Sequence, residues 1–373
     1  MPDSITYLDL LGSRTASAAN PGTGLVGRDI IIVPPQHREL DTDRARDLLE
    51  NLSANRVLDR IARDFKENLI KSAKSALTKL SQEAEAALLG ENEKLALEAI
   101  VIAQGIRPVV NFEGGHLDYT NADLGSWAQF TKSDAGIIET VARSVGRINL
   151  DGRQVGTGFV VSDREIMTNR HVLAAIGLET DGVWRVRKGA NISFADDGNG
   201  SEGLKLAHHG ASTGNAKAAT GVDFGQFDYA IIPVETRFFA PKFPAPLVLE
   251  ETRSNVIFDR PVYVLGYPGR PQAGTERFSL LKDLFESKYG TKRYCPGRIS
   301  ASFSDVQSDP LNTVFGHDCT TLGGNSGSPV IDLGDGSACV IGIHFAGARR
   351  ISNYAHSMAA LQNKFNNDRL VFI

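Results

Sequence analysis

The residues with the clearest potential for chemistry are one serine and the glycines around it, in residues 320–330 (TTLGGNSGSPV). Gly and Asn tolerate positive φ, so this stretch predicts a tight, strained turn that projects the Ser326 hydroxyl outward. The same turn would direct the backbone N–H groups of Gly324 and Ser326 into one small concavity. Acyl transfer needs this arrangement, a nucleophile beside donors placed where an oxyanion forms. A bare Gly-x-Ser-x-Gly also occurs in ordinary glycine-rich loops, so the inference depends on the longer string.

That longer string, residues 324–330 (GNSGSPV), resembles the nucleophile loop of trypsin-like serine peptidases, particularly the bacterial branch that includes the glutamyl endopeptidases. A second resemblance lies in residues 156–161 (GTGFVV) followed by residues 167–173 (MTNRHVL). It is similar to the general-base segment of the same family and assigns that role to His171. Secreted animal members place a disulfide-forming Cys after this histidine. Val172 occupies that position here, which fits a reducing compartment.

The third member of the triad is expected to be a buried carboxylate that orients the imidazole. Residues 227–234 (FDYAIIPV) resemble the family's acidic segment and assign the role to Asp228. Asp223, in a glycine-containing loop, and Asp259, ahead of an Arg-Pro pair, are the alternatives. The chain order His171, Asp228, Ser326 is that of the chymotrypsin fold. The resemblance therefore implies a serine endopeptidase that works through an acyl-enzyme, with the oxyanion held by the N–H groups of Gly324 and Ser326.

The resemblance also implies a substrate pocket. Residues 340–347 (VIGIHFAG) match the strand that walls the S1 pocket in the family. The implied S1 residues are Thr320, Thr321, His344, Phe345 and Gly347. A hydroxyl and an imidazole can donate hydrogen bonds to a P1 carboxylate, whereas a basic P1 would need an acid where Thr320 stands. We expect an acidic or small P1 residue, with Leu322 a departure from the closest motifs.

Composition limits the other possibilities. The chain has 373 residues and a formal net charge of −4. This charge provides no overall positive potential that would favour nucleic-acid binding, and the sequence has no apolar run of about 18 residues that would span a membrane. The three cysteines are too few for a disulfide framework, and residues 1–5 lack a secretory pattern, so we expect a cytoplasmic protein. The implied mechanism needs no metal or other cofactor. The pair His208-His209 lacks the ligand spacing of a zinc site and predicts a surface loop.

The N-terminal part has a different residue pattern. Residues 1–40 carry one strand-like run at 29–33 and no assignable chemistry. Leucines and other apolar residues recur at helical spacing over residues 42–104, which predicts about three amphipathic helices. We expect this helical module to pack on its own core, and to bind a partner protein or restrain the active site.

From residue 144 the pattern is all-β, with short runs rich in β-branched residues separated by turns. The expected fold is α+β and multidomain: a helical module, then a double six-stranded barrel of chymotrypsin type. The predicted boundaries are 1–40, 41–135 (helical module and linker) and 136–373, with barrels at about 144–250 and 255–373. An amphipathic insertion at 278–292 is expected to overhang the cleft, and 360–365 to form a closing helix.

Two other functions remain open. One is a catalytically silent peptidase fold that serves as a binding scaffold. The other is an adaptor whose helices at 42–104 bind a partner protein. No sequence of Ile-Val-Gly-Gly type opens the β-rich part, so we expect no obligatory trypsin-like activation cleavage.

Overall fold

The computed structural model divides into two compact units, Met1–Ile106 and Arg107–Ile373. It describes residues 4, 7, 8, 11, 40, 42–54, 63–103, 108–120, 124–196, 203–216, 223–235, 243–269, 289–306, 309–334, 336–348, 352–365 and 369–373. The strand-like run at 29–33 and most of the predicted insertion at 278–292 lie outside these residues. No helix among them is both long enough and apolar enough to cross a membrane.

The first unit contains the predicted amphipathic helices, which the structure confirms. They are α2 (Thr42–Ala54), α3 (Arg63–Glu83) and α4 (Glu91–Ala103), with a short 3₁₀ turn, η2 (Ala84–Ala86), after α3. Their apolar stripes bury leucines such as Leu48, Leu52, Leu77 and Leu80. The start of α4 is held by Glu93, which accepts the Gly90 N–H at 2.7 Å and pairs with Lys79 at 2.9 Å. The unit therefore has a core of its own.

The second unit ends in a closed six-stranded barrel. Its strands follow the order β12-β15-β16-β17-β14-β13, and pairing of β13 with β12 closes the circle. The bounds are β12 (Pro261–Gly266), β13 (Arg293–Ala301), β14 (Val314–His317), β15 (Pro329–Asp332), β16 (Val340–Ala348) and β17 (Ser352–Ser357). The predicted closing helix appears as two short turns, α9 (Met358–Leu361) and η4 (Gln362–Lys364).

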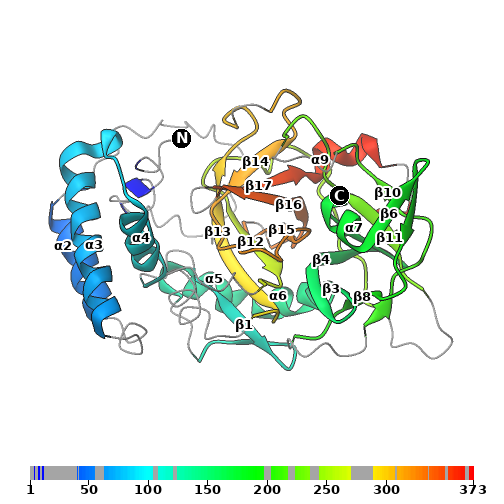
Figure 1. Ribbon diagram of the computed structural model, residues 1–373, viewed down its shortest axis with the longest axis horizontal. Helices are drawn as coiled ribbons and strands as arrows, with labels where there is room; N and C mark the ends of the chain where they lie inside the picture. Colours follow the sequence, from blue (N-terminus) through cyan, green and yellow to red (C-terminus); the bar gives the residue numbers. More distant parts are fainter. Residues whose placement is uncertain are drawn as a thin grey trace. The chain divides into compact units, whose positions relative to one another are not determined.

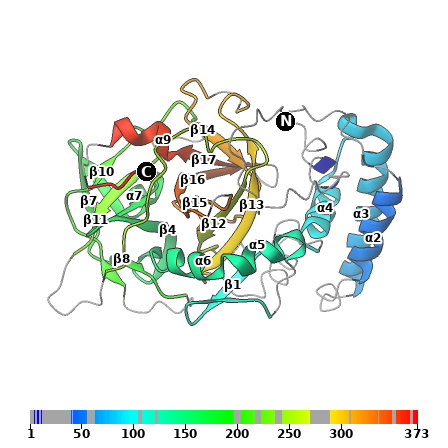
Figure 2. The same ribbon diagram turned by 180° about the vertical axis from the view of Figure 1, so that it is seen from behind.

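The first barrel of the chain precedes this second barrel, and its strand order is β11-β5-β4-β3-β8-β9. A single bridge between Leu206 and Val234 joins its two edges, supported by the hydrogen bond from the Ala207 N–H to the Pro233 carbonyl at 2.8 Å. The bounds are β3 (Val145–Leu150), β4 (Arg153–Ser162), β5 (Glu165–Thr168), β8 (Ala190–Ser193), β9 (Leu204–Lys205) and β11 (Ala230–Pro233). Short β10 (Ser212–Thr213) also pairs with β11, and β6 (Gly177–Thr180) forms a separate hairpin with β7 (Val183–Val186). In Figures 1 and 2 this green barrel lies beside the yellow-to-red one. The predicted double barrel is confirmed.

The boundary between the units differs from the prediction. The second unit begins at Arg107 rather than at residue 136, because the segment assigned to a linker joins the second barrel. Strand β1 (Val110–Glu113) pairs with β13, and β2 (His116–Asp118) pairs with β1. Trp127 is buried in the main core that β1 also enters. Helices α5 (Ala128–Ser133) and α6 (Ala135–Ala142) then lead into β3.

One buried lysine connects α6, the loop after β8 and the start of β13. Lys292, just before β13, donates from Nζ to the Ala142 carbonyl at 2.7 Å and the Phe194 carbonyl at 2.9 Å, and it pairs with Asp196 at 3.1 Å. Burial lowers the pKa of Lys292, and Asp196 opposes that shift. A buried ammonium is tolerated only where its donors are satisfied. The contacts therefore fix the end of α6 and the loop after β8 against the start of β13.

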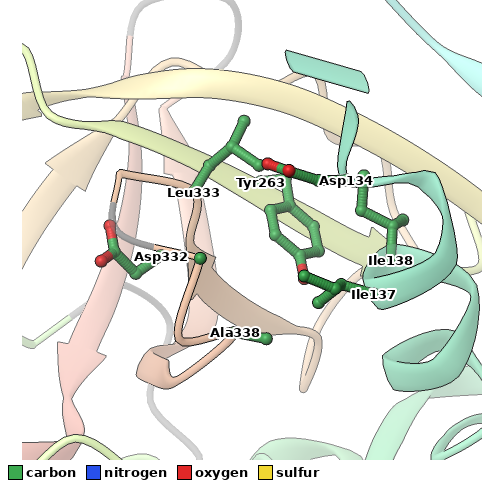
Figure 3. Close-up of a pocket in the computed structure, with 8 residues that line it drawn as sticks. Asp134, Ile137, Ile138, Tyr263, Asp332, Leu333 and Ala338 are labelled. Carbon is green, nitrogen blue, oxygen red and sulfur yellow. The ribbon is translucent and has the colours of Figure 1, made fainter. Parts of the chain in front are cut away.

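A small pocket lies where α6 covers the second barrel (Figure 3). It is lined by Tyr263 of β12, by Ile137 and Ile138 of α6, and by Leu333 and Ala338 in the turn that follows β15. Burial raises the pKa of Tyr263 well above its ordinary value. The pocket contains none of the residues that the sequence selects for chemistry.

Candidate active site

His171 and Asp228 are brought together by strand pairing. His171 follows β5 on the first turn of α7 (Arg170–Ile176), and Asp228 lies two residues before β11. Because β11 runs antiparallel to β5, with Ala230 opposite Thr168, the end of one strand lies beside the start of the other. The imidazole Nδ1 lies 2.6 Å from Asp228 Oδ2, and the His171 backbone N–H donates to Oδ1 at 3.0 Å.

The Asp228 side chain is largely buried, whereas the imidazole of His171 is 44% exposed. Burial alone would raise the pKa of Asp228, but its hydrogen bonds and charge interaction with His171 outweigh burial and lower it. The two alternative acids have other partners. Asp223 accepts the Gly225 N–H at 2.9 Å, and Asp259 pairs with Arg298 at 3.4 Å. The structure therefore pairs His171 with Asp228.

Two residues that the sequence did not indicate hold the backbone of Asp228. The Asn169 side chain donates to the Asp228 carbonyl at 2.8 Å. The Asp228 N–H donates to Nε2 of His356 at 3.2 Å. His356 is fully buried on β17, and Phe345 stacks on its ring at 4.0 Å. Asn169 adjoins His171 in the sequence. His356 lies in a strand of mostly polar residues (SNYAHS), where nothing in the sequence distinguishes it from its neighbours.

The serine turn has the left-handed glycines that its sequence predicts. Gly324 has φ +97° and Gly327 has φ +87°. The Gly323 carbonyl accepts the Gly269 N–H at 2.6 Å, and the Asn325 carbonyl accepts the Ser328 N–H at 2.9 Å. The C=O and N–H of a trans peptide point in opposite directions. The amides that follow these carbonyls, those of Gly324 and Ser326, are therefore directed away from the two anchoring groups.

The same turn is pressed against the strands that lead to His171. The Thr157 N–H of β4 donates to the Ser326 carbonyl at 2.9 Å. A Cβ on Gly327 would lie 2.2 Å from the Thr157 carbonyl oxygen and 2.4 Å from Oγ1 of Thr168, three residues before His171. A Cβ on Gly156 would lie 2.7 Å from the Val172 side chain and 3.2 Å from the Ser326 carbonyl. The segments that carry Ser326 and His171 therefore meet at one seam between the barrels.

The predicted S1 residues gather in part. Thr321 donates to the Oδ1 of Asn353 at 2.6 Å, and a Cβ on Gly347 would lie 2.7 Å from the same oxygen. Asn353, which the sequence did not indicate, also donates to the Cys319 carbonyl at 2.7 Å. Thr320 is half-buried. The ring of Phe345 packs inward against His356 and Phe224, so only its backbone is available to a substrate.

His344 is buried on β16, and its Nδ1 lies 3.2 Å from Nε2 of His317 on β14. Burial, with a smaller contribution from nearby His171, lowers the pKa of His344 to about 3. Burial likewise lowers the pKa of His356 to about 4 and that of His317 well below its ordinary value. Three imidazoles therefore remain neutral in the folded barrel. His317 is a further residue that no sequence motif marks.

The predicted surface pair His208-His209 makes its contacts outside this cluster. His208 contacts the Val186 carbonyl through Nδ1 at 2.5 Å, and its ring lies 4.2 Å from that of His209. The three cysteines, Cys295, Cys319 and Cys339, are buried, and none of them forms a disulfide.

Two antiparallel barrels with a serine turn and a His–Asp pair at their seam define the class of chymotrypsin-fold serine peptidases. Comparison with known proteins agrees with this class, since residues 156–343 match the trypsin-like peptidase domain. The chain belongs to the trypsin-like peptidase family. It is therefore a serine endopeptidase of trypsin-like type, and its substrates are proteins or peptides.

A probable serine protease of Lysobacter enzymogenes is 29% identical over 320 residues, which cover 81% of this chain and 82% of that protein. Among solved structures, mouse neuropsin is 12% identical, with a TM-score of 0.44 over 60% of this chain and 93% of that one. A Glu endopeptidase is 16% identical, with a TM-score of 0.42 over 60% of this chain and 88% of that one.

The neutral histidines predict how stability depends on pH. Their pKa values are lower in the folded chain than in the unfolded chain, so the unfolded chain binds more protons in the interval between. Stability should therefore fall as the pH drops below about 6.5 toward about 4, by up to ~1.4 kcal/mol per pH unit for each histidine. Both tryptophans, Trp127 and Trp184, belong to the second unit, so their fluorescence during urea unfolding at pH 7, 6 and 5 reports on this unit. His356→Gln should reduce the slope by about a third. A free energy of unfolding that is flat between pH 7 and 5 would contradict the assignment.

Proposed function

We propose that Ser326, His171 and Asp228 act as nucleophile, general base and orienting acid in peptide-bond hydrolysis. The observation that carries the proposal is the contact of the His171 ring with Asp228 through Nδ1, at the seam where the Ser326 turn packs. This contact directs the Nδ1 proton to the carboxylate and leaves Nε2 as the base. A histidine oriented in this way is the form that a serine nucleophile requires.

The reaction would proceed in two halves. Ser326 Oγ forms a bond to the carbonyl carbon of the substrate while its proton passes to His171 Nε2. The amide N–H groups of Gly324 and Ser326 would donate to the resulting oxyanion. The C–N bond then breaks, and His171 returns the proton to the leaving amine. Water repeats the sequence on the acyl-enzyme, and Ser326 is regenerated with release of the carboxylic acid.

A fluorophosphonate probe tests the nucleophile. Its phosphorus should bond to Ser326 Oγ with loss of fluoride, so Ser326→Ala should abolish labelling and turnover. Ser328→Ala is the matched control, because its hydroxyl is buried without a partner among the described residues, and labelling should persist. Asp228→Asn should retain the fold and lower kcat by about 10⁴. An unlabelled wild-type chain would instead favour the catalytically silent scaffold.

We also infer an acidic or small P1 residue. Support comes from the neutral imidazole of His344, which can recognise a carboxylate as a hydrogen-bond donor rather than as a charge. Both candidates have partners in the structure: the Thr321 hydroxyl donates to Asn353, and the His344 ring contacts His317 and the Tyr354 backbone. A P1 carboxylate would therefore replace one of these contacts, and His344 is the candidate that we test. No acid stands at Thr320 to pair with a basic P1 residue.

Peptides that differ only at P1 test this preference. kcat/KM should be higher for Glu and Ala than for Lys, and His344→Leu should lower the ratio of Glu to Ala by about tenfold or more, since a buried hydrogen bond to the substrate is lost. His209→Leu removes an exposed imidazole outside the seam and serves as the control. A ratio that His344→Leu leaves unchanged would exclude His344 from P1 recognition.

We propose further that the helical module binds a partner protein that targets or restrains the peptidase. The module forms a compact unit with its own core, and Leu88 ahead of α4 is 84% exposed. A compact unit with its own core can carry a binding surface independently of the peptidase fold, and Leu88 is a position on it where a substitution leaves the core intact.

In the full-length chain, Leu88→Asp should weaken partner capture or change protein cleavage, while turnover of a short peptide stays the same. Leu178→Asp, at a leucine that is 64% exposed in the second unit, is the matched control. Equal effects of the two variants on every readout would argue against a role for the module surface.

A further inference from the structure

The role proposed for Ser326 requires that the flanking peptides stay in one orientation. Gly324 follows another glycine and has φ +97°, so the backbone at this point has little intrinsic stiffness. The peptide before Gly324 is fixed by the hydrogen bond from the Gly269 N–H to the Gly323 carbonyl, at 2.6 Å. In the peptide after Gly324, the Asn325 N–H donates to the Leu322 carbonyl at 3.1 Å, a contact within the same loop. The Gly324 carbonyl needs an anchor outside the loop, because rotation there would move the Ser326 amide.

Thr157 supplies that anchor. Its hydroxyl donates to the Gly324 carbonyl at 2.8 Å and accepts the Tyr267 N–H at 3.2 Å. A threonine hydroxyl has one proton and two lone pairs, so these contacts use its donor and one acceptor site. The residue is fully buried, which removes water as a substitute partner.

The backbone of Thr157 holds the other side of the serine. Its N–H donates to the Ser326 carbonyl at 2.9 Å, and its carbonyl accepts the Thr168 hydroxyl at 2.7 Å. Thr157 on β4 therefore contacts the Gly324 and Ser326 carbonyls. It also contacts Tyr267, the residue that follows β12, and the strand end that precedes His171. Among the described residues, no other side chain donates to the Gly324 carbonyl.

We propose that Thr157 is a positioning residue for the oxyanion site, acting through its side-chain hydroxyl. The hydroxyl fixes the Gly324 carbonyl, and so holds the Gly324 and Ser326 amides where the oxyanion forms. The inference rests on the proposed function of Ser326. Because the oxyanion exists only after attack, the contact stabilises the transition state more than the bound substrate. Its loss should therefore appear in kcat rather than in KM.

Thr157→Val removes the hydroxyl and keeps the shape of the side chain. We expect kcat to fall by about 10- to 100-fold and KM to change by less than about threefold, since an unanchored donor pair stabilises the oxyanion poorly. Thr157→Ser retains the hydroxyl and should keep kcat within about threefold of wild type. Thr131→Val is the matched control, because it deletes another fully buried threonine hydroxyl, one that bonds Tyr294 at 3.2 Å.

A peptide aldehyde provides the readout that general destabilisation would not change. Ser326 Oγ adds to the aldehyde carbon, and the former carbonyl oxygen becomes the hemiacetal oxygen in the oxyanion site. Thr157→Val should raise the inhibition constant of the aldehyde by about the same factor as it lowers kcat. The inhibition constant of the matching peptide alcohol, whose terminal carbon has no carbonyl oxygen and cannot form a hemiacetal, should be unchanged.

Three outcomes overturn the inference while fluorophosphonate labelling of wild-type Ser326 stands. They are wild-type kcat in Thr157→Val, equal losses in Thr157→Ser and Thr157→Val, and an equal loss in Thr131→Val. Thermal melting checks the fold, and Thr157→Ala deletes the same hydroxyl if the valine variant does not fold. A wild-type chain that neither labels nor cleaves overturns the proposed function itself, which separates the two failures.

Discussion

The site depends on the close approach of two backbones, β4 and the serine turn. The approach leaves no room for a side chain at position 327, because a Cβ added to Gly327 would lie 2.2 Å from the Thr157 carbonyl oxygen. Gly324 is similarly enclosed by Tyr267, Gly269 and Gln154. Both glycines also have left-handed φ, which other residues adopt only with strain. The glycines of the motif therefore allow the second barrel to present its serine against the first barrel.

The first barrel contributes the histidine and the aspartate through its strand register. Ala230 lies opposite Thr168, and a one-residue slip between β5 and β11 would separate His171 from Asp228. The register is fixed because Ile166 and Ile232, which are opposite each other, are both fully buried. The hydrophobic core of the barrel thus determines a contact between two polar side chains at its edge.

The amino-acid sequence was sufficient for the elements that carry a local signature. The serine turn is recognisable because glycine and asparagine are required where φ is positive, and the helices at 42–104 because their period is 3.6. The boundary at residue 107 was missed, because pairing of β1 with β13 joins residues about 180 positions apart and leaves no local trace. The roles of His317 and His356 could not be predicted for a related reason. Each lies in a short strand, and only the folded barrel shows which polar atom its imidazole contacts.

Those histidines are unusual core residues and call for a physical reason. A leucine at position 317 or 356 would fill the barrel without the cost of a buried polar group, which is about 1–3 kcal/mol when the group lacks a partner. Both imidazoles retain an Nδ1 without a partner among the described residues, so part of this cost is present here. Each compensates on its other nitrogen, His317 at His344 and His356 at the Asp228 backbone. Both of these contacts are made to residues of the proposed active site, so the polar side chains in the core continue the hydrogen-bond network of the site. The barrel is less stable than an all-apolar core would make it, and the residues at its edge are oriented in return.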